Sequence, residues 1–319
     1  MRTRFKGNNI MSKKVFVTGG CGYIGTSLVP LLLQEGYEVT VYDLLRSGGD
    51  GIVHNFASSN FKFIKGDILD KEHLAESIKG HDIVVHLAAI VGLTACRRDP
   101  ELTQQVNHQG TKNVIECLDG SQFLIYGSTG SNYGAVKGIC TEETPLNPLS
   151  IYGKTKTLGE EEVMRYGNST AFRFATAFGV SPRMRLDLLV NDLSYLASTQ
   201  KYLVIYESHF MRTFIHVRDI ARVFKFTIEN ADKMSGEVYN VGSEKMNFSK
   251  KDVCDLIQKR TGCYVHYADF DGDVDKRDYV VSYNKINSLG FETTIGLEEG
   301  IEELLDVFPL IKIENKYQN

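Results

Sequence analysis

The sequence predicts an α/β fold in which a doubly wound parallel sheet carries a smaller C-terminal lobe. Short β-branched runs alternate with helix-length segments through the first half, a glycine-rich turn follows the first run, and the alternation loosens after Gly179. Alternation of this kind is typical of a parallel sheet with helices on both faces. Right-handed crossovers then bring the carboxyl ends of the strands to one edge of the sheet.

The first half supplies the strands and helices of this sheet in order. The β-branched and aromatic runs predict strands at residues 14–18, 38–42, 61–65, 82–86, 123–126 and 170–174. The longer segments between them predict helices at residues 23–36, 71–79, 100–118 and 152–166.

The second half predicts a smaller lobe that packs on the first. A helix is expected from about residue 186, and short strand-like segments occur at 214–217 and 237–242. We expect a main domain over 13–178, with segments returning to it near 212–243, and a second lobe over 179–311. Residues 1–12 are basic and polar without periodicity, so we expect a disordered extension there.

Composition narrows the classes of function. The chain of 319 residues is 42% hydrophobic, enough for a large core, and its formal net charge of −4 gives no basic field for nucleic acid or an anionic membrane. No apolar run reaches the roughly 18 residues of a membrane span, and the N-terminus lacks a signal-peptide segment, so a cytoplasmic location is expected. Six scattered cysteines without a Cys-x-x-Cys pair predict reduced thiols, with neither disulfides nor a metal site.

The glycine-rich turn predicts a dinucleotide site of the Rossmann type. Gly19, Gly22 and Gly25 lie between the first strand and the first helix, where a tight backbone approaches a pyrophosphate at a helix N-terminus. Asp43 ends the second strand, where an acid accepts hydrogen bonds from ribose hydroxyls and repels a 2′-phosphate. NAD is therefore favoured over NADP, although Arg46 lies close by. Further candidate cofactor residues are Tyr23, Ile24, Asp67, Ile68, Leu87, Ala88 and Ala89.

Tyr152 and Lys156 are candidate catalytic residues. They lie four residues apart on an expected helix, so the ammonium of Lys156 can sit beside the phenol of Tyr152. A neighbouring positive charge favours the phenolate, which makes Tyr152 a candidate general base for hydride chemistry on an alcohol or ketone.

Taken together, the motifs resemble the extended short-chain dehydrogenase/reductases that act on nucleotide sugars. They are Thr18-Gly-Gly-Cys-Gly-Tyr-Ile-Gly25, Gly66-Asp-Ile68, His86-Leu-Ala-Ala89, Asn107-x-x-Gly-Thr111, Tyr152-Gly-Lys-Thr-Lys156, Arg212-Thr-Phe-Ile-His-Val-Arg-Asp219 and Asn240-Val-Gly242. Segments 172–192 and 275–279 look like the branch of bacterial sugar-nucleotide 4-epimerases and 4-oxidoreductases, including dehydrogenases that oxidise C4 of GDP-heptoses. The galactose epimerases differ, because the Asn they often carry is Thr176 here.

This resemblance implies further roles. Thr129 would be the third catalytic residue, hydrogen-bonding the sugar oxygen while Tyr152 takes its proton and hydride passes to NAD. The second lobe would bind a GDP- or UDP-linked sugar, and the family suggests a homodimer formed by helices 100–118 and 152–166. The resemblance also adds Asn107, Ser128, Tyr152 and Lys156 to the candidate cofactor residues. The candidate substrate residues are Ser128, Thr129, Arg183, Arg185, Asn191, Arg212 and Arg277, and the guanidinium groups of the arginines would bind the nucleotide diphosphate.

Several readings stay open. A 4-keto sugar that takes the hydride back on its other face gives a 4-epimerase, and one that leaves gives a 4-dehydrogenase, in either case for surface polysaccharide sugars. A 4,6-dehydratase is weaker, because Gly130 and Ser131 stand where such enzymes usually carry Asp-Glu. A non-catalytic NAD-binding regulator on the same fold is the remaining alternative.

Overall fold

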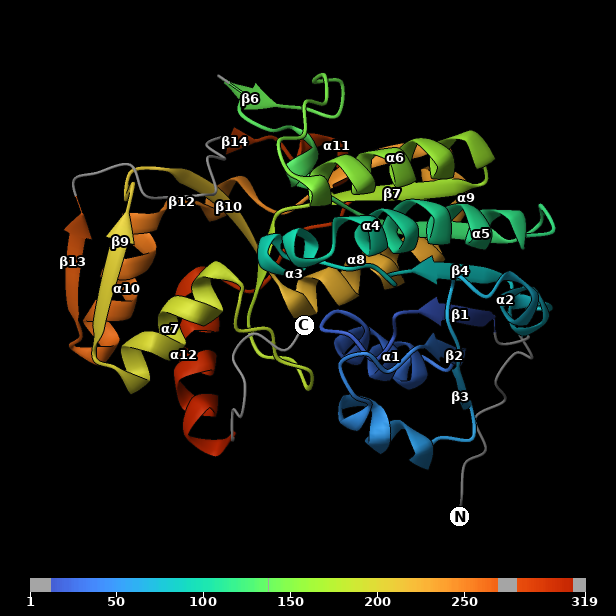
Figure 1. Cartoon of the computed structure of the whole chain (residues 1–319), viewed down its shortest axis with the longest axis horizontal. Coiled ribbons are helices and arrows are strands. Elements are labelled where there is room, and N and C mark those ends of the chain that lie inside the picture. The colour runs from blue at the N-terminus through green and yellow to red at the C-terminus, as the bar shows by residue number, and fades with distance from the viewer. Residues whose placement is uncertain (1–12, 137, 269–279, 312–319) are drawn as a thin grey trace, which may run out of the picture.

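The computed structural model describes residues 13–136, 138–268 and 280–311. It consists of a large sheet covered by helices and a smaller lobe beside it, which Figure 1 shows on the left with β9, β13, α7, α10 and α12. The extension expected over residues 1–12 lies outside the described residues.

The large sheet is parallel and has seven strands. They are β1 (Lys14–Thr18), β2 (Glu38–Asp43), β3 (Phe61–Lys65), β4 (Ile83–His86), β5 (Phe123–Thr129), β7 (Ser169–Phe174) and β11 (Glu237–Val241). Their order is β11-β7-β5-β4-β1-β2-β3, with every neighbouring pair parallel. The chain runs outward from β1 to β3 and then crosses to β4 on the other side of β1. This reversal opens a crevice at the carboxyl ends of β1 and β4, the usual ligand site of such sheets.

Helices cover both faces of the sheet, which confirms the doubly wound fold. Val17 of β1 shares one core with Leu28 of α1 (Gly25–Gln34) and Phe224 of α8 (Val217–Glu229). The neighbouring Phe16 points to the other face and shares a second core with Val163 of α6 (Ile151–Tyr166). Successive side chains of a strand point to opposite faces, so one strand holds both layers in place. The second layer also contains α2 (Lys71–Ile78) and α5 (Gly110–Glu116).

The helix expected over 100–118 is interrupted. It consists of α4 (Pro100–Gln104), a π-helical segment η2 (Gln105–Gln109) and α5. Such π turns are often found at functional sites, and this one contains Asn107. Among the further elements that the sequence patterns missed are the 3₁₀ helix η1 (Asp50–Ala57) and α3 (Leu93–Arg98), which lies beside α6.

The smaller lobe has a core of its own. Leu193 of α7 (Leu189–Thr199), Ile257 of α10 (Lys250–Thr261) and Leu304 of α12 (Leu297–Val307) meet there with Phe178 and Phe214. Its strands β9 (Tyr202–Tyr206) and β13 (Tyr264–Ala268) are parallel. The domain boundary at 178/179 stays a prediction.

Short strands connect the two lobes. In one small sheet, β10 (Met211–His216) lies between β8 (Thr176–Phe178) and β12 (Asn247–Ser249), and in another β6 (Ile139–Cys140) pairs with β14 (Val280–Val281). The remaining elements are α9 (Ala231–Met234), α11 (Asn284–Asn287), η3 (Gly130–Asn132), η4 (Glu244–Met246) and η5 (Phe308–Leu310). Across the described ranges, none of the helices combines the length and the apolar character needed to cross a membrane.

Candidate active site

The turn after β1 fits only glycine at two of its predicted positions. Gly19 has a φ of 71°, and a Cβ on it would lie 2.6 Å from the backbone nitrogen of Ala88. A Cβ on Gly25 would lie 2.5 Å from the backbone of Gly20. The turn therefore packs directly against the loop after β4 while α1 begins behind it, which leaves main-chain N–H groups at the helix start for an anion.

Asp43 closes this site at the end of β2. Its Oδ2 accepts a hydrogen bond from the Cys21 N–H at 3.0 Å, and its Oδ1 accepts one from the Leu45 N–H at 2.7 Å. Burial raises the pKa of the Asp43 carboxyl, and these two N–H donors oppose that shift. Each carboxylate oxygen can accept more than one hydrogen bond, so Asp43 can still receive ribose hydroxyls.

The glycine turn and Asp43 line a cavity of about 260 Å³. It brings together most of the predicted cofactor residues, namely Gly19, Gly22, Tyr23, Ile24, Gly25, Asp43, Asp67, Ile68, Leu87, Ala88 and Ala89. Arg46 lies in the same wall. A tight glycine turn at a helix start, with an acid one strand away, fits a dinucleotide.

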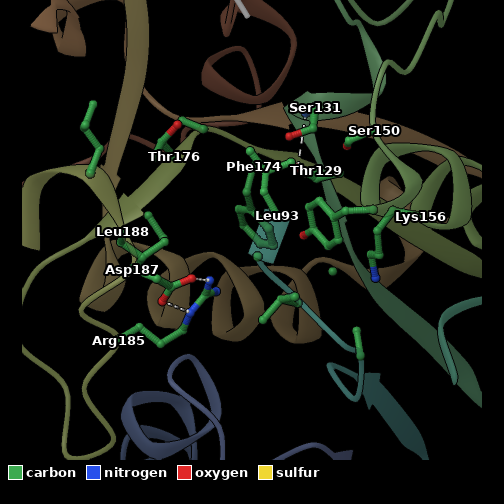
Figure 2. A pocket seen from close by; sticks show the side chains of 18 of the residues that line it. Leu93, Thr129, Ser131, Ser150, Lys156, Phe174, Thr176, Arg185, Asp187 and Leu188 are labelled. Atoms are coloured by element: carbon green, nitrogen blue, oxygen red, sulfur yellow. Dashed lines mark hydrogen bonds and ion pairs between the residues drawn. The ribbon is translucent and has the colours of Figure 1, made fainter. Parts of the chain in front are cut away.

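The predicted catalytic residues line a second cavity of about 600 Å³. Thr129 is the last residue of β5, and Tyr152 and Lys156 lie in the first two turns of α6, whose N-cap Ser150 accepts a hydrogen bond from the Gly153 N–H. Ile24, Leu87, Ala89, Val91, Ala177 and Arg185 line both cavities, so the two are neighbours in one crevice. Figure 2 shows Lys156 on one side of the catalytic cavity and Arg185 with Asp187 on another.

Thr129 caps the short helix η3 and still has a hydrogen to donate. Its Oγ1 accepts a hydrogen bond from the Ser131 N–H at 3.2 Å, the dashed line between the two in Figure 2. A hydroxyl has one hydrogen and two lone pairs, so this bond leaves the hydrogen available to a ligand oxygen. Ser128 differs, because its Oγ donates to Glu160 Oε2 at 2.6 Å.

Lys156 is a buried cation beside the cavity. Its side chain lies over the ring of Tyr126, with Nζ 3.9 Å from the ring centroid. Burial lowers the pKa of Lys156 to about 7, and the carboxylate of Glu160 opposes this shift. Burial and the charge of Lys156 together lower the pKa of His86 to about 3, so His86 is a neutral neighbour.

Two predicted ligands line neither cavity. The amide of Asn107 binds both backbone groups of Ile90, accepting from its N–H at 2.7 Å, and donates to Thr155 of α6 at 3.2 Å. Asn191 accepts from the Gly179 N–H and donates to the Arg185 carbonyl, both at 2.9 Å. Both side-chain amides bind backbone groups, so the two residues support the loops that form the site and do not line it.

The predicted arginines differ in their surroundings. Arg185 lines both cavities, and its Nε and Nη2 donate to the two carboxylate oxygens of Asp187 at 3.0 and 2.6 Å. Arg183 lines the cofactor cavity and donates to the Met184 carbonyl. Arg212 is only 4% exposed and lines the catalytic cavity. Arg277 lies outside the described residues.

Sequence motifs did not indicate several residues that line the catalytic cavity. Lys250, at the first position of α10, is buried and donates from Nζ to the Tyr206 carbonyl at 3.0 Å. Lys250 and Arg212 lie 5.3 and 5.9 Å from the ring of Phe210, so two cations approach one aromatic side chain. Leu93 and Arg97 come from α3.

Comparisons with known proteins identify the family. A family model described as the NAD dependent epimerase/dehydratase family matches residues 15–242. A UDP-N-acetyl-alpha-D-glucosaminuronate decarboxylase of Bacillus cytotoxicus is 32% identical over 73% of this chain and 76% of its own length. A dTDP-glucose 4,6-dehydratase of Streptomyces niveus is 26% identical over 92% of each chain.

A solved structure agrees with this assignment. The UDP-glucuronic acid 4-epimerase of Bacillus cereus, in complex with UDP-glucuronic acid and NAD, has a TM-score of 0.82 and 26% identity over 93% of this chain and 99% of its own. These relatives carry out different reactions, so the similarity identifies the family and the cofactor but not the substrate. The chain belongs to the NAD dependent epimerase/dehydratase family and is an NAD-dependent enzyme of the extended short-chain dehydrogenase/reductase type.

Proposed function

We propose that this enzyme oxidises the C4 hydroxyl of a nucleotide-linked sugar to a 4-keto sugar. The observation that carries the proposal is that Thr129, Tyr152 and Lys156 line one cavity, next to the cavity of the glycine turn. A hydroxyl, a phenol and an ammonium together can hold a sugar oxygen and take its proton. The UDP-glucuronic acid 4-epimerase described above supports this choice, since it was solved in complex with a UDP-linked sugar and NAD.

Each residue has one task in this reaction. NAD, when bound, supplies the acceptor and donor of the hydride. The phenolate of Tyr152 takes the proton of the C4 hydroxyl, and the ammonium of Lys156 favours that phenolate. Thr129 donates its hydrogen to the same oxygen. Leu93 and Phe174, in the same cavity, exclude water from this end of the site (Figure 2).

The fate of the keto sugar decides between a 4-epimerase and a 4-dehydrogenase, and we propose these two activities for surface polysaccharide sugars. Dehydration is disfavoured, because the residues after Thr129 are Gly130 and Ser131, neither of which can act as an acid or base there. Among the described residues that line the catalytic cavity, the carboxylates are Asp187 and Asp192. Asp187 already accepts both hydrogen bonds of the Arg185 fork.

The substrate is proposed to be a GDP- or UDP-linked sugar. Arg212 and Lys250 place two buried positive side chains in the wall of the catalytic cavity, which suits a diphosphate.

We also propose a homodimer that pairs through α5 and α6, two helices that pack side by side on one face of the sheet.

A substrate screen tests the reaction. GDP-, UDP-, dTDP- and CDP-sugars are incubated with the enzyme and NAD, and products are identified by mass spectrometry and NMR. We expect a C4 epimer or a 4-keto sugar from one class, whereas a 4-keto-6-deoxy product would overturn the proposal.

Tyr152→Phe should bind NAD as the wild type does and lose sugar oxidation, because the ring stays and the base is gone. Turnover retained by this variant contradicts the mechanism.

A further inference from the structure

A buried polar network lies behind the wall that carries Thr129 and Lys156. Its centre is Glu160, which follows Lys156 by one turn of α6 and is only 3% exposed. The Glu160 carboxylate accepts hydrogen bonds from Ser128 Oγ at 2.6 Å, Asn132 Nδ2 at 3.0 Å and Arg173 Nη2 at 2.6 Å. A buried carboxylate needs donors of this kind, because an unpaired charge in the interior is costly.

The network connects the catalytic helix to three strands of the large sheet. Arg173, on β7, donates from Nη1 to the Tyr133 hydroxyl at 3.1 Å and to the Glu142 carbonyl at 2.9 Å. The Tyr133 hydroxyl donates to Asn240 Oδ1, on β11, at 2.6 Å. Ser128 belongs to β5 and directly precedes Thr129. Glu160 therefore fixes the helix that carries Tyr152 against the strand end that carries Thr129.

The same carboxylate acts electrostatically on Lys156. Among the described residues, four ionisable groups lie near Lys156, namely Tyr152 and Glu160 on α6, His86 on β4 and Tyr126 on β5. Three cations of the described chain lie further out. Arg173 on β7 is paired with Glu160, and Arg97 of α3 and Arg185 line the cavity wall. His86 is neutral, because burial and Lys156 lower its pKa to about 3. Glu160 is the carboxylate in this set, and its charge raises the pKa of Lys156 against the effect of burial.

We propose that Glu160 is a positioning residue of this enzyme with two tasks. Its carboxylate holds the end of β5 that carries Thr129, and its negative charge keeps the buried ammonium of Lys156 charged beside Tyr152. Arg173 pairs with the same carboxylate through Nε at 3.0 Å and Nη2 at 2.6 Å. The inference rests on the proposed roles of Tyr152 and Lys156, but it concerns a residue that need not touch the substrate or NAD.

Two variants that break the same ion pair test the electrostatic task. Glu160→Gln removes the negative charge and Arg173→Gln removes the positive one. The ionisation of Lys156 is followed by NMR titration of 13C-labelled lysine side chains, with the signal assigned through Lys156→Met. We expect the pKa of Lys156 to fall by about one unit or more in E160Q and to rise in R173Q, since one unit is about a tenfold change in protonation. No shift of the Lys156 pKa in E160Q, or a rise there, overturns the proposal.

Glu160→Asp tests the positional task and keeps the experiment decisive if E160Q does not fold. The shorter side chain retains the charge but cannot keep the contact with Ser128. We expect a Lys156 titration close to that of the wild type, a kcat roughly tenfold lower and an unchanged KM, because a loosened strand end misplaces Thr129 in the transition state. An unchanged kcat, or a Lys156 titration displaced as far as in E160Q, contradicts the two-task model. The NMR readout does not depend on turnover, so a failure of the proposed reaction is recognised separately by Tyr152→Phe.

Discussion

At the scale of single residues, Thr129 shows how one hydroxyl can serve the fold and the reaction. Its Oγ1 accepts the Ser131 N–H, and its hydrogen is left for a ligand. Thr129→Val keeps the shape but removes that donor, so we expect kcat to fall by about 10²–10³, the usual loss for one donor to a reacting oxygen. Thr129→Ser is the matched control and should retain most of the activity. Steady-state kinetics of both variants decide the matter, and a Thr129→Val loss no larger than that of Thr129→Ser would contradict the donor role.

Lys156 predicts a pH dependence of stability. Its pKa is lowered from the ordinary 10.5 to about 7 by burial, so the unfolded chain binds this proton more tightly than the folded one. The resulting penalty on folding is complete below about pH 7 and is relieved as the pH rises toward 10.5. Lys156→Met should therefore melt at a higher temperature than the wild type near neutral pH, by about 2–4 °C for each kcal/mol relieved.

Thermal unfolding from pH 6 to 10 measures this difference. The gap between Lys156→Met and the wild type should be largest at the low end and shrink steadily toward pH 10, while sugar oxidation is lost throughout. A variant that melts below the wild type at every pH would mean that Lys156 is a net stabilising residue.

At the scale of elements, the motif residue Asp219 is expected to stabilise the fold. It lies in the first turn of α8, is fully buried, and accepts hydrogen bonds from the N–H groups of Thr294 and Ile295 at 3.0–3.1 Å and from Arg222 at 2.6 Å. Asp219→Ala removes the buried acceptor of these two N–H groups and of Arg222, so we expect a loss of about 1–3 kcal/mol in the free energy of unfolding. Denaturant unfolding measures it, with the exposed Asp232→Ala as the control that should change little.

The elements also show which parts of the site were predictable. Gly19 follows β1 directly, Asp43 ends β2 and Tyr152 lies in the first turn of α6, so the local sequence determines where each of them lies. Asn107 carried an equally clear motif, but it is buried in the π segment and its amide is used by the main chain of Ile90. The motif therefore identified the correct region of the site, but it did not show whether the side chain faces the ligand or supports the surrounding main chain.

Contacts between distant elements were beyond the sequence patterns. Arg185 was expected to bind the substrate, and it does line both cavities, yet its guanidinium is held by Asp187 two residues later. Lys250 reaches the cavity from the start of α10 and has no motif around it. The place of such residues in the cavity depends on how the two lobes, each with its own core, pack together. The large sheet could be predicted because it depends only on the local alternation of strands and helices.

At the scale of the whole molecule, the proposed dimer would pair through the helices that carry the active site. Leu158 lies on α6 and is 38% exposed, two residues beyond Lys156, on a surface otherwise rich in charged side chains such as Glu161 and Arg165. If two copies pair through α5 and α6, Leu158 becomes buried between them, and Leu158→Asp should separate the dimer because a buried carboxylate without a partner is unfavourable. Light scattering coupled to size-exclusion chromatography measures the mass, and NAD binding reports whether the fold is intact.

The matched control for this prediction is Val204→Asp, at an exposed position of β9 in the smaller lobe. We expect a dimer for the wild type and for V204D, and a monomer that still binds NAD for L158D. A dimer that survives L158D but not V204D would place the interface on the β9–β13 sheet. Because Tyr152 and Lys156 lie on the same helix as Leu158, a lower kcat in monomeric L158D with unchanged NAD affinity would further show that pairing steadies α6 for catalysis.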